Sequence, residues 1–104
     1  MIELKRIPTH PGQILKEEFL DEFGLTQTEL ATALGTTFRT INELINEKRN
    51  LSVEMAIKLS KFFGTSVELW VNLQNQYDIH RVYNKNKDLI KKVRPFKSKK
   101  RKVV

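Results

Sequence analysis

The sequence contains no cysteine, only four glycines and three prolines, and no long apolar run. Without cysteine the chain has neither a disulfide framework nor a thiolate metal site, and this composition fits a reducing cytoplasm. No apolar stretch approaches the roughly 20 residues that a membrane span requires, and no signal-peptide pattern opens the chain. We therefore expect a cytoplasmic protein that does not enter a membrane.

Residue groupings that would carry enzyme chemistry are also missing. The two histidines, His10 and His80, are far apart in the sequence and lack a nucleophile constellation, so we interpret both as structural or exposed. There is no glycine-rich phosphate loop. The carboxylates within residues 17–22 fit an exposed acidic helix surface better than a catalytic pair. The sequence thus predicts no enzyme, no catalytic or metal site and no cofactor, and the acidic surface is free to face a second partner.

The positive charge of the chain is confined to its C-terminal part. The whole sequence carries 19 Lys or Arg against 12 Asp or Glu, a net charge of +7. Residues 81–104 hold 11 basic residues and one acid, a net of +10, which leaves 8 basic and 11 acidic residues, a net of −3, in residues 1–80. The basic segment suits a polyanion such as DNA or RNA, or serves only as a solubilising tail; both interpretations stay open.

Residues 25–46 predict two short helices joined by a tight turn. The sequence TQTE at residues 26–29 has the T-x-x-E spacing of a capping box at a helix start. Gly35 permits the left-handed backbone at which one helix ends and the next, capped by Thr36 or Thr37, begins. Apolar residues at helical spacing are Leu30, Ala31 and Leu34 in the first helix and Ile41, Leu44 and Ile45 in the second. The pattern is that of a helix-turn-helix, although by itself it also fits an ordinary helical hairpin.

The outward side of the second helix favours DNA binding over an ordinary hairpin. If the apolar residues face the core, that side carries Phe38, Arg39, Asn42, Glu43 and Asn46. Arg, Asn and Glu side chains can hydrogen-bond base edges, and Phe and Thr can contact the methyl group of thymine. An exposed Phe38 is hard to explain as part of a solvated surface.

The same stretch resembles the helix-turn-helix of the lambda-repressor and Cro family. Gln27 follows the first cap, the pair Leu30-Ala31 comes next, and the G-x-[ST] sequence of residues 35–37 opens the second helix. In addition, Lys48 and Arg49 follow the second helix, where cations meet the phosphate backbone beside the groove. The resemblance implies binding to double-stranded DNA.

Three further helices complete the predicted fold. The first runs from about His10 to Phe23, with Pro11 in its first turn. The fourth begins at Ser52, and its inward residues are Met55, Ala56, Leu59, Phe62 and Phe63. The fifth begins at Thr65 or Ser66 with a second T-x-x-E box at residues 65–68. Its apolar stripe, whose outer edge we expect to form a dimer contact, comprises Leu69, Trp70, Leu73 and Tyr77.

Motifs at both ends of this region resemble those of the HigA-type (VapI-like) antitoxins. The opening motif is HPGQIL at residues 10–15, followed by EFL at residues 18–20. The closing motif comprises FGTS at residues 63–66, with ELW, NLQ and YD within residues 68–78. The resemblance implies an all-helical Cro/C1-type domain that dimerises, represses its own operon and neutralises a partner toxin. Such a toxin is typically a ribosome-dependent mRNA-cleaving ribonuclease of the HigB kind.

The expected DNA contacts combine the residue chemistry with this resemblance. The residues predicted to read bases are Thr37, Phe38, Arg39, Thr40, Asn42 and Glu43. The residues predicted to bind phosphates are Thr26, Gln27, Asn46, Lys48 and Arg49. Two departures matter: the family usually has glycine where this chain has Glu47, and Glu43 and Glu47 weaken the local positive potential. We expect Asn46 to supply the left-handed residue at the end of that helix instead.

The predicted fold class is therefore all-α: a five-helix lambda-repressor-like DNA-binding domain with a helix-turn-helix, plus a basic C-terminal tail. We assign residues 1–9 to an N-terminal arm, residues 10–81 to the domain with its C-terminal dimerisation helix, and residues 82–104 to a disordered tail. Leu89, Ile90 and Val93 have the spacing for one further helical turn before Pro95. Two alternatives to the antitoxin remain: a stand-alone Cro/C1-type repressor, and a protein-binding antidote whose DNA contact is incidental.

Overall fold

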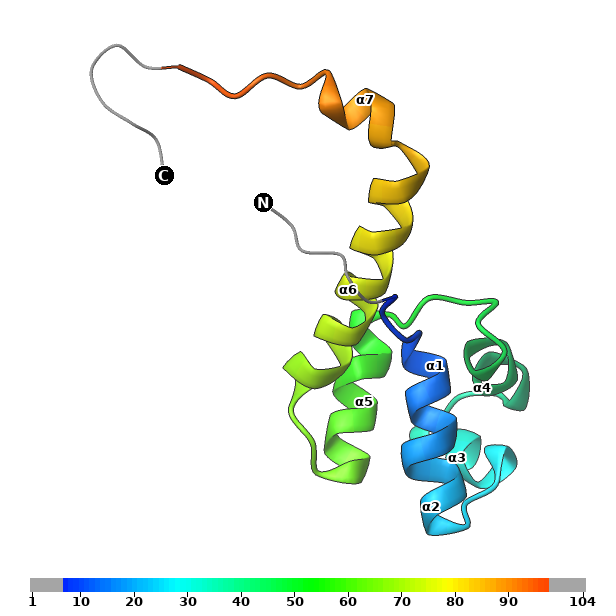
Figure 1. The fold of residues 1–104 in the computed structure, drawn as a ribbon. Coiled ribbons are helices and arrows are strands. Elements are labelled where there is room, and N and C mark those ends of the chain that lie inside the picture. Colours follow the sequence, from blue (N-terminus) through cyan, green and yellow to red (C-terminus); the bar gives the residue numbers. More distant parts are fainter. Residues whose placement is uncertain (1–6, 98–104) are drawn as a thin grey trace.

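The chain folds as a bundle of helices from which one long helix extends (Figure 1). The structure is a computed structural model that describes residues 7–97, and every regular element within that range is helical. Predictions for residues 1–6 and 98–104 lie outside the described residues. The elements are α1 (Pro11–Ile14), η1 (Leu15–Leu20), α2 (Asp21–Phe23), α3 (Gln27–Leu34), α4 (Phe38–Ile45), α5 (Val53–Phe63), α6 (Val67–Lys85) and α7 (Lys87–Lys91). Because α1, η1 and α2 follow one another without a break, they correspond to the single first helix that the sequence predicts.

The middle of this first helix is a π-helix, which the sequence did not indicate. The backbone N–H of Asp21 donates to the carbonyl of Lys16, five residues earlier. The wider turn changes which residues face inward, so Leu15 and Leu20 are buried while Phe23 is 63% exposed. Leu15 and Phe19, four residues apart, lie in or against the core, whereas Phe23 four residues further on does not follow them inward.

The start of the first helix is fixed by the residues of its HPG sequence. His10 is the N-cap, and its Nδ1 accepts a hydrogen bond of 2.9 Å from the backbone N–H of Gly12. Pro11 occupies the first turn, where its missing N–H costs nothing. His10 is buried and packs edge-on against Tyr77, with ring centroids 4.8 Å apart. His10 is therefore a structural residue, as predicted.

Side-chain caps define the starts of the next four helices. Thr26 and Glu29 form the predicted capping box, with both reciprocal hydrogen bonds present. Thr37 caps α4 and Ser52 caps α5. The second predicted capping box is wrong, because Ser66 caps α6. The Thr65 hydroxyl instead accepts a hydrogen bond of 2.8 Å from the indole of Trp70.

The core lies where the first helix, the helix-turn-helix and the pair α5–α6 meet. Its buried apolar residues are Leu15, Leu20, Leu30, Ala31, Leu34, Ile41, Leu44, Ile45, Leu51, Met55, Ala56, Leu59 and Trp70. Two predictions fail here. Phe62 is 44% exposed rather than inward, and Trp70 is fully buried, so it cannot belong to a dimer contact. Trp70 turns inward because its indole ring then packs in the core while its N–H still donates to the Thr65 hydroxyl.

The last long helix continues beyond the predicted boundary at residue 81. Helix α6 runs to Lys85, because residues 82–85 contain no glycine or proline to end it. After Asn86 the short α7 forms around Leu89 and Ile90, so the further helical turn is confirmed. The start of the segment predicted to be disordered is thus helical. Figure 1 shows α7 leading away from the bundle.

Candidate nucleic-acid interface

The second helix of the helix-turn-helix has a buried side and an exposed side. On α4 the side chains of Ile41 and Leu44 are at most 1% exposed, while Phe38 is 51% exposed. The side chain of Arg39 is 85% exposed. Thr37 is also exposed, whereas Thr40, Asn42 and Glu43 are half-buried at the edge of this surface. Burial of the apolar stripe therefore turns Phe38 and Arg39 outward, as predicted, whereas Asn42 and Glu43 are turned only partly outward.

Hydrogen bonds within the protein hold the half-buried members of this surface in place. The Thr37 hydroxyl accepts from the backbone N–H of Thr40 at 3.1 Å and lies 3.0 Å from the Thr40 hydroxyl. The Asn42 amide donates to Oε1 of Gln27, at the start of α3, at 3.1 Å. This bond uses the acceptor atom of Gln27, so the amide N–H groups of Gln27 remain as donors for a phosphate oxygen. The bond thus joins a candidate base-reading residue to a candidate phosphate-binding residue.

The charged residues of the surface form one linked group. Oε2 of Glu43 accepts from Nε of Arg39 at 3.0 Å. Oε1 of Glu43 accepts from Arg49 through Nε at 3.1 Å and Nη2 at 2.7 Å. These hydrogen bonds, first from Arg49 and then from Arg39, lower the pKa of the Glu43 carboxyl, which favours its charged form. The i, i+4 spacing of Arg39 and Glu43 allows their bond, but no sequence pattern indicated the bond to Arg49, which lies six residues beyond Glu43 in a loop.

The loop between α4 and α5 carries the other predicted phosphate contacts. Asn46, Lys48 and Arg49 are all exposed, as that role requires. The backbone corrects one expectation, because Asn46 has a φ of −86° whereas Glu47 has a φ of +60°. Glu47 itself is therefore the left-handed residue. The Asn46 side chain donates instead to the carbonyl of Asn42, which tethers it to the helix end.

A residue that the sequence analysis missed holds this loop. Gln74 of α6 is buried, and its Oε1 accepts a hydrogen bond of 2.7 Å from the backbone N–H of Leu51. Its amide donates to Asp78 at 3.0 Å and to Asn50 at 3.3 Å. The available signal was its position four residues after Trp70, on the same side of α6. A buried amide with partners on both sides anchors the loop to the domain.

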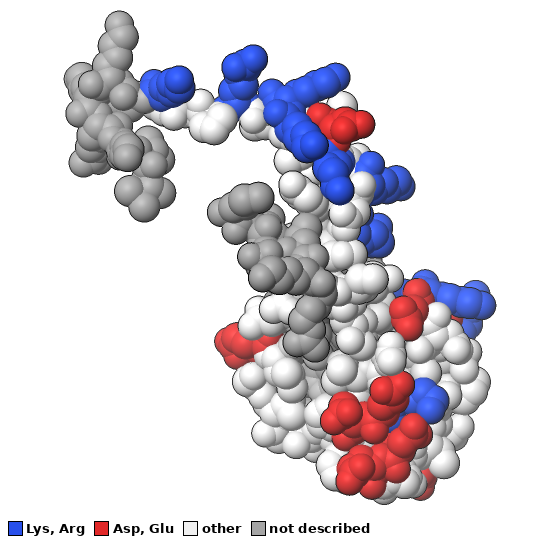
Figure 2. All heavy atoms as spheres, in the orientation of Figure 1, with Lys and Arg blue, Asp and Glu red and all other residues white. Residues whose placement is uncertain are grey.

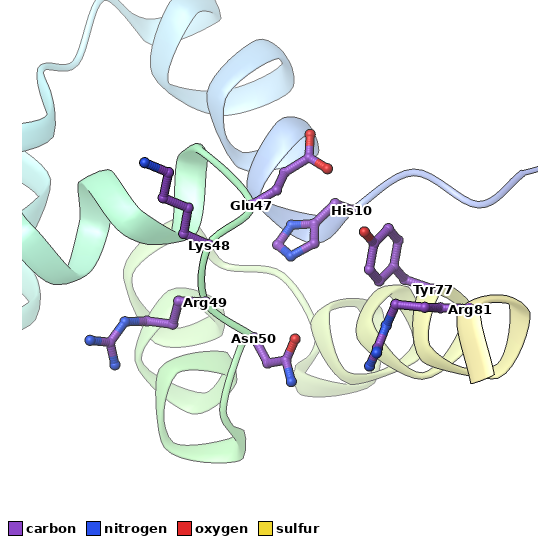
Figure 3. Close-up of a pocket in the computed structure, with 7 residues that line it drawn as sticks. All are labelled: His10, Glu47, Lys48, Arg49, Asn50, Tyr77 and Arg81. Atoms are coloured by element: carbon purple, nitrogen blue, oxygen red, sulfur yellow. The ribbon is translucent and has the colours of Figure 1, made fainter. Parts of the chain in front are cut away.

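A pocket of about 330 Å³ lies between this loop, the start of α1 and α6 (Figure 3). It is lined by His10, Glu47, Lys48, Arg49, Asn50, Tyr77 and Arg81. In Figure 3 the Lys48 and Arg49 side chains extend away from His10 and Tyr77, so the cations do not converge on one point. Within residues 7–97 no group of three or more His, Asp or Glu residues is placed to hold a metal ion.

The surface charge is divided between the body and the extended segment. Figure 2 shows Asp and Glu side chains gathered on the body, and Lys and Arg following the segment that leads away from it. The described acidic residues of the first helix, within 17–22, belong to the body, and Lys85, Lys87 and Lys91 belong to α6 and α7. None of the helices in the described part of the chain is long and apolar enough to cross a membrane.

Comparison with known proteins identifies the family to which this chain belongs. The sequence profile of the helix-turn-helix family matches residues 15–70, and the chain belongs to that family. Antitoxin HigA-1 of Vibrio cholerae is 37% identical over 96 residues, which are 92% of this chain and 90% of that protein. Virulence-associated protein I of Dichelobacter nodosus is 40% identical over 70 residues, or 67% of this chain; the match spans 65% of that relative, slightly less than two thirds.

A solved structure agrees with the sequence relatives. The antitoxin HigA of Pseudomonas aeruginosa, solved with the higBA promoter, is 40% identical and superposes with a TM-score of 0.81. The superposition covers 85% of this chain and 97% of that one. Within the helix-turn-helix family, the chain belongs to the HigA-type antitoxins.

Proposed function

We propose that this protein is an antitoxin that binds operator DNA as a dimer through its helix-turn-helix and represses its own operon. The observation that carries the proposal is the exposed side of α4, where Phe38 and Arg39 project from a helix whose opposite side is buried. The Pseudomonas aeruginosa antitoxin HigA, solved with the higBA promoter, supports operator binding by this chain. The expected place of action is the cytoplasm.

In the proposed complex, α4 of each subunit enters the major groove. The two recognition helices lie about 34 Å apart, which matches successive turns of B-DNA. Arg39 pairs with a guanine, while Phe38 and Thr40 contact neighbouring base edges or methyl groups. Lys48 and the N-termini of α3 and α4, capped by Thr26 and Thr37, set the register on the phosphates.

The dimer contact is proposed on α6, where Leu69 is kept from the first prediction and the other residues are changed. Leu73 and Tyr77 are partly buried within their own subunit, so little of their surface remains for a partner. Leu69, Ile79 and Val82 are 38%, 47% and 45% exposed. These three residues supply the apolar surface for a second copy.

The second half of the proposal is neutralisation of an mRNA-cleaving toxin of the HigB kind. The name of the Vibrio cholerae relative, antitoxin HigA-1, supports this partner. The acidic residues within 17–22 offer a surface for this partner, because their negative charge repels DNA phosphates and suits a basic protein. A short neighbouring gene for a basic ribonuclease would be the expected source of the partner.

A mobility-shift measurement with the full chain tests the DNA half. The probes are a duplex containing the promoter upstream of its gene and a shuffled duplex of the same composition. We expect preference for the promoter by about 10³-fold or more. Equal affinity for the two duplexes would exclude operator recognition. Co-purification with the product of the neighbouring gene tests the antitoxin half, and its failure beside a positive DNA result would indicate a stand-alone repressor.

A further inference from the structure

The geometry points to a positioning role for Glu43: its carboxylate orients Arg39 for base reading and withholds Arg49 from the DNA phosphates. The inference rests on the proposed DNA-binding function and changes the role expected for Glu43, which the sequence predicted to read a base itself. It also changes the role expected for Arg49, which the sequence predicted to bind phosphate.

The hydrogen bonds of Glu43 favour positioning over base reading. A carboxylate offers about four acceptor positions. Arg39 occupies one on Oε2, and Arg49 occupies two on Oε1. The carboxylate side chain is only 26% exposed, whereas that of Arg39 is 85% exposed. A base edge would therefore meet the arginine before the carboxylate.

The hydrogen bond between Glu43 and Arg39 suits bidentate recognition of a guanine by Arg39. Glu43 holds Arg39 through Nε, while the two terminal nitrogens of the guanidinium make no hydrogen bond to the described residues. Guanine presents O6 and N7 in the major groove, and arginine reads this pair with two N–H groups. Holding Nε fixes the plane of the guanidinium before DNA arrives, which reduces the entropy lost on binding.

The hydrogen bonds between Glu43 and Arg49 lower DNA affinity, whereas the bond to Arg39 favours binding. Two nitrogens of Arg49 are committed to Glu43, at 3.1 Å and 2.7 Å, and the carboxylate neutralises its charge locally. A carboxylate on a groove-facing helix also repels phosphates. Glu43 therefore weakens binding to any DNA while it sharpens the contact made by Arg39. The consequence is a gain in sequence preference at the expense of total affinity.

The experiment compares the wild-type chain with Glu43→Gln and Glu43→Ala. The preferred duplex is first selected from a random-sequence pool with the wild-type protein. Affinities for this duplex and for a random duplex are then measured at salt concentrations from about 50 to about 300 mM, which bracket physiological ionic strength. Circular dichroism and thermal unfolding verify that the variants fold. Glu47→Gln is the matched control, because it removes one negative charge from the same region and Glu47 forms no ion pair within the described residues.

We expect both Glu43 variants to bind random DNA more tightly and to lose about tenfold in preference for the selected duplex. The salt dependence on random DNA should steepen by about 0.9 in log–log slope, because the released Arg49 can then neutralise one phosphate. The lost preference should concentrate at one guanine position, the same one that Arg39→Ala affects. Glu47→Gln should leave the preference unchanged.

Two outcomes would overturn the inference while leaving the proposed function intact. If the Glu43 variants lose selectivity at a position different from that of Arg39→Ala and the salt slope stays constant, Glu43 reads a base directly. If they change both affinities by the same factor as Glu47→Gln, only net charge matters. Failure of the wild-type chain to select any duplex would instead exclude the proposed operator binding itself.

Discussion

Gly12, at the start of α1, lies directly against the backbone carbonyl of Leu44, near the end of α4. A methyl group on Gly12 would overlap that carbonyl oxygen. Because the obstructing atoms belong to the backbone, they cannot move aside as a flexible side chain would. The first helix thus supports the recognition helix through a contact that only glycine permits.

Replacing Gly12 with alanine should lower the free energy of unfolding by about 1–3 kcal/mol, the usual cost of overpacking a close contact. Urea denaturation followed by circular dichroism measures the change. Gly35→Ala serves for comparison, because its site is open space and only the left-handed φ of +67° opposes a side chain. That variant should lose about 1–2 kcal/mol. Wild-type stability in Gly12→Ala would show that α4 shifts freely, contrary to the packing.

Replacing Glu47 with glycine should stabilise the protein. A side chain at a φ of +60° costs about 1–2 kcal/mol, and glycine recovers this but loses about 0.5–1 kcal/mol of chain entropy. The expected net gain is at most about 1.5 kcal/mol in the free energy of unfolding. Glu47→Gln keeps the Cβ and should show no gain, which separates backbone strain from charge. A loss of stability in the glycine variant would mean that Glu47 makes an interaction worth more than the strain.

Helix starts and helix sides were predictable from the sequence, whereas some backbone conformations were not. Helix starts with a polar cap, such as Thr26 and Ser52, were predictable because the cap and its donor lie within one turn. The outward position of Arg39 followed from helical periodicity. The π-turn of η1 was not predictable, because no residue pattern marks it. The left-handed backbone at Glu47 was indicated only by the glycine that the family has there, and the identity of Glu47 itself pointed away from it.

The hydrogen bonds that link α4 to other elements were not predictable for a related reason. The bond between Arg49 and Glu43 joins a loop to a helix, and the bond between Asn42 and Gln27 spans 15 residues. Neither spacing falls on a repeating pattern. Trp70 was wrongly placed at a dimer surface because an aromatic stripe does not reveal which of its members turns inward. Local chemistry therefore predicted the elements, whereas contacts between elements required the structure.

Replacing Arg39 with alanine should weaken binding to the preferred duplex by about 1–3 kcal/mol and leave random-DNA binding nearly intact. The reason is that the exposed guanidinium reads a base edge rather than a phosphate. Arg39→Lys is the informative companion, because lysine keeps the charge but lacks the planar pair of donors. Lysine should restore little of the lost preference. Full recovery with lysine, or equal losses on both duplexes, would assign Arg39 to the phosphate backbone.

Stability should decrease in mild acid because of His10. Burial lowers the pKa of its imidazole, while the Glu47 carboxylate, the backbone of Arg49 and the Asp78 carboxylate act in the opposite direction. The neutral ring is therefore favoured in the fold, and the unfolded chain, with its pKa near 6.5, binds the proton first. The free energy of unfolding is at its full value above pH 6.5 and falls below it until the lowered pKa of the folded state is reached.

The measurement is urea denaturation at pH 7.5 and pH 5.5, values on either side of the ordinary histidine pKa of about 6.5. His10→Asn keeps an acceptor for the N-cap but does not titrate, so its stability should change less between the two pH values than that of the wild type. His80→Asn retains His10 and should behave as the wild type does. An unchanged pH dependence in His10→Asn would show that the buried imidazole does not control acid stability.

Truncation after Asn86 separates the two roles left open for the basic tail. Helix α7 has no buried residue, so removing residues 87–104 should leave the free energy of unfolding unchanged. If the tail binds DNA, the salt dependence of binding should flatten by about 0.9 in log–log slope for each phosphate that the tail neutralises in the full-length protein.

A full-length variant with Lys87, Lys91 and Lys92 changed to glutamine shows whether α7 binds those phosphates. We expect both variants to lower the slope, because these cations follow Lys85 along the extended basic segment. A slope equal to that of the wild type in the truncated chain would identify the tail as a solubilising segment that does not bind DNA.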